Sequence, residues 1–173
     1  MTATESVQRR LTADEPSLAP WRAFIEAHAR VSRRLDEELR AEHDLSLAEY
    51  EALVSIAQSP GRRIRMRQLS DRVILSKSGV TRLIDRLVAD GLVERSACLA
   101  DARGAEAVLT DDGLTRLRSA SRTHLRGITE HFLEPLDGTD VVALEAAMRA
   151  ISVSAGPGHG PCCPDDAGAA DQH

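Results

Sequence analysis

The segment from Ser76 to Gly91 constrains the fold of this chain most strongly. Its apolar residues recur at helical spacing and form a single stripe, made of Val80, Leu83, Ile84, Leu87 and Val88. Ser76 precedes the stripe as a candidate N-cap, and Gly91 follows it where a left-handed residue would end a helix. The opposite face is polar and basic and carries Lys77, Ser78, Thr81, Arg82, Asp85 and Arg86. The segment therefore predicts an amphipathic helix, from about Ser76 to Asp90, that is anchored on one face.

The hydrophobic period changes on leaving this helix. Residues 92–95 and 105–109 alternate between apolar and polar like two strands, and Asp101–Gly104 between them predicts a polar turn. Ahead of the helix, a short helix with Met66, Leu69 and Val73 on its inner face leads into a turn at 74–76. Two helices joined by a tight turn and followed by a β-hairpin are typical of a winged helix-turn-helix unit.

Further helices flank this unit. Ser46 and Glu49 form a capping box that should open a helix ending near Pro60, and Thr110 should cap a long helix that ends near Pro135. We expect a mostly α fold with a small β-hairpin wing. The expected organisation is a flexible arm at 1–17, a dimerisation helix at 18–44, the winged helix-turn-helix domain at 45–110, C-terminal dimerisation helices at 111–153 beginning their second helix near Thr139, and a disordered tail at 154–173. The flanking helices are too apolar to stand alone, which favours a two-fold interface.

Charge is distributed unevenly. The chain has a formal net charge of −5, yet residues 62–103 hold ten basic and five acidic side chains. This segment is therefore basic by five charges inside an otherwise acidic chain. A local basic segment of this kind indicates a phosphate-binding face, although a merely solvated arginine-rich surface would look the same.

The predicted helix at 76–90 meets the physical requirements of a DNA reader. Its N-terminus offers N–H groups to a phosphate, Ser78 and Thr81 are short donors, and Arg82 is long enough to reach a guanine edge. Arg103 at the predicted hairpin tip suits the minor groove, and Asp101 is interpreted as its orienting partner. The predicted DNA-binding residues are Arg65, Ser76, Lys77, Ser78, Thr81, Arg82, Arg86, Arg95, Asp101 and Arg103.

The motifs and their order resemble the multiple antibiotic resistance regulator (MarR) family of bacterial transcription factors over roughly residues 20–153. The resemblance rests on segments 45–50, 69–73, 75–87, 101–104 and 109–113. It implies a homodimer on a pseudo-palindromic operator, released by a small-molecule effector, and repression rather than activation. Residues 1–20 lack the apolar segment of a signal peptide, so we expect a cytoplasmic protein. No Gly-rich phosphate loop, nucleophile elbow or paired-histidine helix motif is present, so we expect neither an enzyme nor a cofactor. A winged-helix module that binds protein instead of DNA is the rival class.

Two ligand hypotheses remain open at this point. A cleft between the first, second and fifth helices would bind a small amphipathic, often aromatic, anion through Trp21, Phe24, His28 and Tyr50, although these residues could equally be core. Glu42 and His43, with His124, resemble the zinc site of some family members and give a zinc-responsive regulator as an alternative, but a second histidine one turn after His124 is missing. Cys98 is interpreted as a wing residue, and Cys162 and Cys163 as part of the tail, rather than as a redox or metal site.

Overall fold

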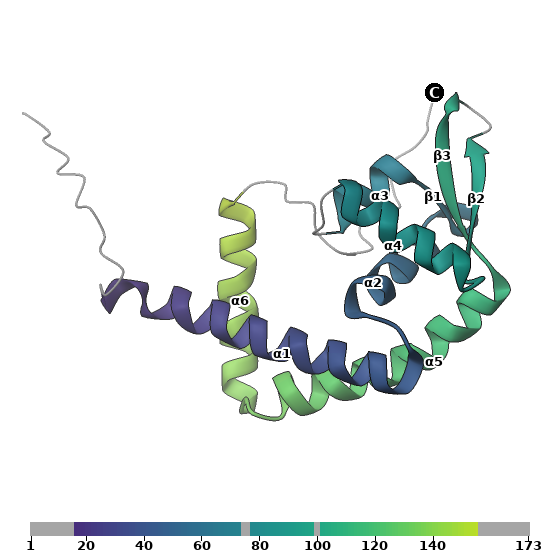
Figure 1. Ribbon diagram of the computed structural model, residues 1–173. Coiled ribbons are helices and arrows are strands. Elements are labelled where there is room, and N and C mark those ends of the chain that lie inside the picture. Colours follow the sequence, from purple (N-terminus) through teal and green to yellow (C-terminus); the bar gives the residue numbers. More distant parts are fainter. Residues whose placement is uncertain (1–15, 74–76, 99–100, 156–173) are drawn as a thin grey trace, which may run out of the picture.

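Figure 1 shows a computed structural model in which residues 16–73, 77–98 and 101–155 are described. The predictions for residues 1–15, Ser76 and the tail from 156 onward fall outside these ranges. The described elements, in chain order, are η1 (Pro16–Leu18), α1 (Ala19–His43), α2 (Leu47–Ala57), η2 (Pro60–Arg62), β1 (Arg63–Arg65), α3 (Met66–Arg72), α4 (Lys77–Ala89), β2 (Val93–Cys98), β3 (Asp101–Leu109), α5 (Asp111–Ile128), η3 (Thr129–Leu133) and α6 (Gly138–Ser154). The mostly α fold with a small β wing is as predicted. Within the described ranges, no helix is both long and apolar enough to cross a bilayer.

The core lies where α2, α3 and α4 meet the sheet. The largest fully buried side chains belong to these elements and to the ends of their neighbours, and include Leu39, Leu53, Ile56, Leu69, Ile84 and Leu87. Four of the five predicted stripe residues of α4 are buried, but Val88 is 36% exposed, so its assignment to the buried stripe is wrong. At 3.6 residues per turn, Val88 lies about 80° around the helix from Val80, which puts it at the edge of the buried face.

The sheet has the strand order β1-β3-β2 and is antiparallel throughout. The pairs Ile64↔Ala107 and Val93↔Leu109 fix its register. The predicted turn at Asp101–Gly104 is wrong, because strand pairing continues through Ala97↔Ala105 to Cys98↔Asp101. Between these two pairs β2 advances by one residue and β3 by four. The extra residues of β3 therefore form an irregularity within the strand and not the predicted turn. The two strands join through residues 99–100, which lie outside the described part.

Three local chain signals behave as predicted. The capping box of α2 is complete, since the Glu49 amide donates to Ser46 Oγ and the Ser46 amide donates to Glu49 Oε2. Thr110 Oγ1 accepts from the Gly113 amide and so caps α5. Gly91 has φ +73°, the left-handed conformation expected after α4. These signals fix where α2 and α5 begin and where α4 ends.

Helices α1 and α5 run side by side in opposite directions beneath the winged unit, and α6 overlaps α1 in the view of Figure 1. The long helix predicted to end near Pro135 is observed as α5 continued by the π-helical turn η3, which ends at Leu133. The sequence pattern registers only helical periodicity and therefore misses the wider turn.

Much of the apolar surface of α1, η3 and α6 is uncovered in one chain. On α1, Leu35 and Leu39 are buried, whereas Trp21 is 59% exposed. The exposed large apolar side chains on these three elements are Trp21, Phe24, Ile25, Phe132, Leu133, Val142, Ile151 and Val153. So many exposed large apolar side chains on three elements are unusual for a surface that faces only water.

Candidate nucleic-acid interface

The outer face of α4 is polar and exposed. Its buried stripe anchors the helix, which leaves Ser78, Thr81 and Arg82 exposed, as predicted for contacts with a ligand outside the fold. The predicted contact Ser76 lies outside the described residues, as do the side chains of Lys77, Asp101 and Arg103. The structure therefore brings Ser78, Thr81 and Arg82 together on one face within a single helical turn.

Arg82 and Arg86 differ in their surroundings although both were predicted to contact DNA. Within the described residues no carboxylate pairs with Arg82. Arg86 is surrounded by acidic groups, with its Nε 3.3 Å from Glu49 Oε1 and 4.0 Å from Asp90 Oδ2, and its Nη2 3.8 Å from Asp44 Oδ1. The structure thus directs Arg86 toward the start of α2, and it favours a positioning role for this arginine over a DNA contact.

The contact of Arg86 with Glu49 is important because Glu49 is a buried carboxylate. Its side chain is 5% exposed, and its Oε2 accepts 2.7 Å hydrogen bonds from both the amide and the hydroxyl of Ser46. The Arg86 guanidinium faces the other oxygen. A buried carboxylate needs such partners, because removing it from water without them is unfavourable. The capping-box pattern identified Glu49 in the sequence, but nothing there indicated that it also connects α2 to α4.

Arg86→Ala is expected to lower the free energy of unfolding by about 1 kcal/mol, since a buried acceptor loses a charged partner that is itself half exposed. Glu49→Gln keeps a capping-box side chain while removing the charge. In a double-mutant cycle followed by urea denaturation, the R86A/E49Q double variant should be more stable than the sum of the single effects implies. Strict additivity would contradict the coupling of these two residues.

The other basic residues of the winged unit divide into paired and outward-facing ones. Arg95 Nη2 lies 2.8 Å from Asp85 Oδ1 and so joins β2 to the outer face of α4. Arg63 pairs with Glu106 and Arg62 with Asp111, which neutralises part of the basic segment. Arg65 is exposed at the junction of β1 and α3, where its amide donates to Gln68. Arg95, like Arg86, therefore has an intramolecular role that the sequence pattern did not show.

The residues of the zinc hypothesis are divided between two settings. Thr123 Oγ1 donates to Glu42 Oε2 at 2.7 Å, and it must therefore accept the 2.8 Å hydrogen bond from His43 Nε2. Hydrogen bonds from Thr123 and Arg126 hold the pKa of Glu42 below its usual value. His124 instead lies against the Tyr50 ring, at 4.5 Å between centroids, and burial lowers its pKa. The structure does not bring the ligand atoms of Glu42, His43 and His124 together.

The aromatic residues of the predicted effector cleft are also separated. Trp21, Phe24 and His28 follow one another along exposed α1, with ring centroids 6.0 and 6.2 Å apart. Tyr50 is buried at the interface of α2 and α5, where its hydroxyl donates to Ser121 Oγ. The structure therefore shows an exposed aromatic stripe and a buried tyrosine, not one shared cleft. Cys98 ends β2, and its side chain lies outside the described part.

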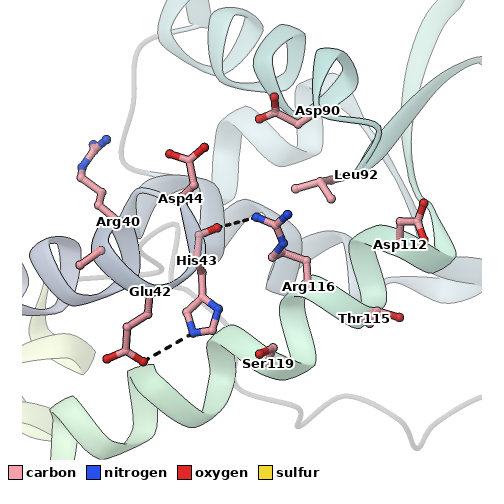
Figure 2. A pocket seen from close by; sticks show the side chains of 11 residues that line it. Arg40, Glu42, His43, Asp44, Asp90, Leu92, Asp112, Thr115, Arg116 and Ser119 are labelled. Carbon is pink, nitrogen blue, oxygen red and sulfur yellow. Dashed lines mark hydrogen bonds and ion pairs between the residues drawn. The ribbon is translucent and has the colours of Figure 1, made fainter.

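A polar pocket of about 670 Å³ lies at the joint between the winged unit and α1 and α5 (Figure 2). Its lining comes from the ends of α1 and α4 and the start of α5: Arg40, Ala41, Glu42, His43, Asp44, Asp90, Leu92, Asp112, Thr115, Arg116 and Ser119. Arg116 crosses the pocket and donates to the His43 carbonyl at 2.6 Å. A molecule bound here would contact both the end of α4 and the helices that support it.

The fold and its exposed reading face define a winged helix-turn-helix protein. A model described as the MarR family matches residues 43–104. Among solved structures, the Streptomyces coelicolor regulator Sco3205 in complex with DNA is 31% identical, with 85% of this chain and 94% of that chain covered and a TM-score of 0.74. AbsC from the same organism is 32% identical over 85% and 97% of the two chains, with a TM-score of 0.73. No curated protein matches in sequence. The chain belongs to the MarR family of transcriptional regulators.

A third similar structure is a mutant of MarR from E. coli complexed with operator DNA. It is 25% identical, with 78% of this chain and 95% of that chain covered and a TM-score of 0.68.

Proposed function

We propose that this protein is a homodimeric transcriptional repressor that binds a pseudo-palindromic DNA operator in the cytoplasm. The observation that carries the proposal is the exposed Ser78–Thr81–Arg82 face of α4, which is supported from behind by a buried apolar stripe. Such a helix fits the major groove, where an arginine can donate two hydrogen bonds to guanine. The β2–β3 hairpin beside it would lie along the neighbouring minor groove. The DNA complexes of the two similar regulators support this assignment.

The homodimer follows from the uncovered apolar surface. Trp21 and Phe24 on α1, Phe132 on η3, and Val142 and Ile151 on α6 are all exposed in one chain. A second copy related by a two-fold axis would bury the same surface on both subunits and would hold the two α4 helices at a fixed separation. Operator half-sites should then lie about one helical turn of DNA apart.

Release by a small-molecule effector is assigned to the polar pocket at the joint (Figure 2). Its position between α4 and the proposed dimer helices means that a ligand there would change the angle between them. The lining holds two arginines, Arg40 and Arg116, and four carboxylates, so the ligand should carry polar groups of both kinds. This differs from the aromatic anion that the Trp21–Tyr50 cleft hypothesis favoured.

The test is selection of bound DNA from a random pool with the full-length protein. We expect a palindromic consensus with two half-sites, and an affinity for it that falls steeply with salt, because bound arginines release counterions from the phosphates. A consensus with a single half-site would contradict the dimer. No enrichment together with a flat salt response would contradict DNA binding and would favour a protein-interaction module.

A further inference from the structure

Three potential metal ligands converge where α1 passes the π-helical turn η3. Glu38 comes from α1, and Glu130 and His131 come from η3; one ligand atom from each lies within 4.8 Å of the others. The described residues contain no other such group of three. This cluster is separate from the Glu42, His43 and His124 set that the sequence suggested.

The Glu38 carboxylate is held in an unusual way. One oxygen, Oε1, is 2.6 Å from His131 Nε2, while the other, Oε2, is buried and has no hydrogen-bond partner. The Arg126 guanidinium approaches Oε2 only to 4.0 Å. Buried acceptors are nearly always satisfied, so an orphaned charged oxygen calls for a ligand.

The backbone beside the cluster makes room for the carboxylate. A Cβ on Gly127 would stand 2.8 Å from Glu38 Oε2 and 2.7 Å from Leu35 Cδ2, so the missing side chain leaves space for the ends of both side chains in their present positions. Directly after it, the helix widens into the π turn that carries both other ligands. Single π turns within α-helices occur frequently at functional sites.

We propose that Glu38, Glu130 and His131 form a binding site for a divalent transition-metal ion, with zinc(II) as the preferred ion. One imidazole nitrogen and two carboxylates are a ligand set that suits zinc, and three protein ligands leave a fourth position for water. The ion would fasten α1 to the end of α5, next to the exposed Phe132 of the proposed dimer surface. The metal site does not depend on DNA binding.

The experiment is a titration of the full-length protein with zinc(II) by calorimetry and with cobalt(II) by visible absorption. Cys98, Cys162 and Cys163 are changed to serine in every sample, so that no thiolate holds the metal. We expect one ion per chain and a higher thermal midpoint with zinc. His131→Gln and Glu38→Gln should each weaken binding by at least about 10- to 100-fold, the loss that even outer-shell changes produce.

His43→Gln is the matched control, because it removes an imidazole of the neighbouring network from the same helix pair. It should leave metal affinity unchanged. Loss of binding in His43→Gln with none in His131→Gln would overturn the proposal in favour of the other set. If the parent protein does not bind zinc(II), or if a less stable His131→Gln variant still binds it normally, the cluster is only a structural ion pair and the proposal is wrong. Circular dichroism of each variant confirms that a loss of binding is not a loss of fold.

Discussion

Arg82→Ala is expected to weaken operator binding by about 5- to 150-fold, corresponding to about 1–3 kcal/mol for one bidentate contact with a base. The reason is the position of Arg82 on the exposed turn of α4, where no described carboxylate competes for its guanidinium. Specificity should relax at one position of each half-site, because the loss concerns a base edge. A gel-shift or fluorescence titration at fixed salt, with the selected operator and a scrambled duplex, measures both effects.

Arg34→Ala is the matched control for Arg82→Ala. Arg34 lies on the exposed face of α1, where it pairs with Glu37, so its removal changes the net charge equally without touching the exposed face of α4. Its effect on affinity should be small, and both variants should keep the parent thermal midpoint. Equal losses in the two variants would show that only general charge attraction is involved, and would remove Arg82 from the reading face.

Arg86→Ala distinguishes a residue that contacts DNA from one that supports the position of α4. Its guanidinium is engaged by Glu49, so its replacement should act first on stability. If operator affinity falls, it should recover in part when Glu49→Gln removes the unpaired buried charge. Arg82→Ala offers no such route to recovery, since its partner would lie on the DNA.

The sequence correctly predicted structural features that depend on residues close together in the chain. The Ser46–Glu49 capping box, the Thr110 cap and the left-handed Gly91 each depend on hydrogen bonds or backbone angles inside one turn, and the structure shows all three. The stripe of α4 was readable for the same reason, except at its edge residue Val88. Local chemistry was therefore sufficient to place the reading helix.

The sequence did not predict contacts between residues that are distant in the chain. The sequence pattern gives no sign that Arg86 and Arg95 form ion pairs. The packing of α2 and β2 against α4 places a carboxylate beside each of them. The pairing of Glu38 with His131 spans 93 residues and depends on the π turn, which has no periodic signature. The wing turn was misplaced because Gly104 and its polar neighbours satisfy turn statistics, while strand pairing with β2 decides the outcome.

The joint between the wing and α5 depends on one close backbone approach. The Leu92 carbonyl, just before β2, accepts a hydrogen bond from the Thr110 amide, and the Thr110 hydroxyl donates toward the Gly91 and Leu92 carbonyls. The same hydroxyl caps α5 through the Gly113 amide. This arrangement draws the first turn of α5 onto the chain that leaves α4, and so sets the angle between the reading helix and the helix beneath it.

Gly113→Ala should disrupt this joint and destabilise the protein. A Cβ at this position would stand less than a van der Waals contact from the rigid Leu92 carbonyl oxygen and 2.8 Å from Leu109 Cδ1. Overpacking costs about 1–3 kcal/mol, and the backbone partner favours the upper end, while the helix propensity of alanine offsets about 1 kcal/mol. We expect a net loss of about 2 kcal/mol and a thermal midpoint about 4–8 °C lower by scanning calorimetry.

Gly138→Ala separates this steric effect from the general consequences of replacing glycine. Gly138 begins α6 with no atom within 4 Å of its would-be Cβ, so alanine there should be neutral or stabilise by up to about 1 kcal/mol. The two variants should thus shift the midpoint in opposite directions or by clearly different amounts. Operator affinity should fall only in Gly113→Ala, although Gly113 is buried and faces no DNA, because displacement of α5 changes the presentation of α4. A Gly113→Ala protein with parental stability and affinity would mean that the joint yields without moving the reading helix.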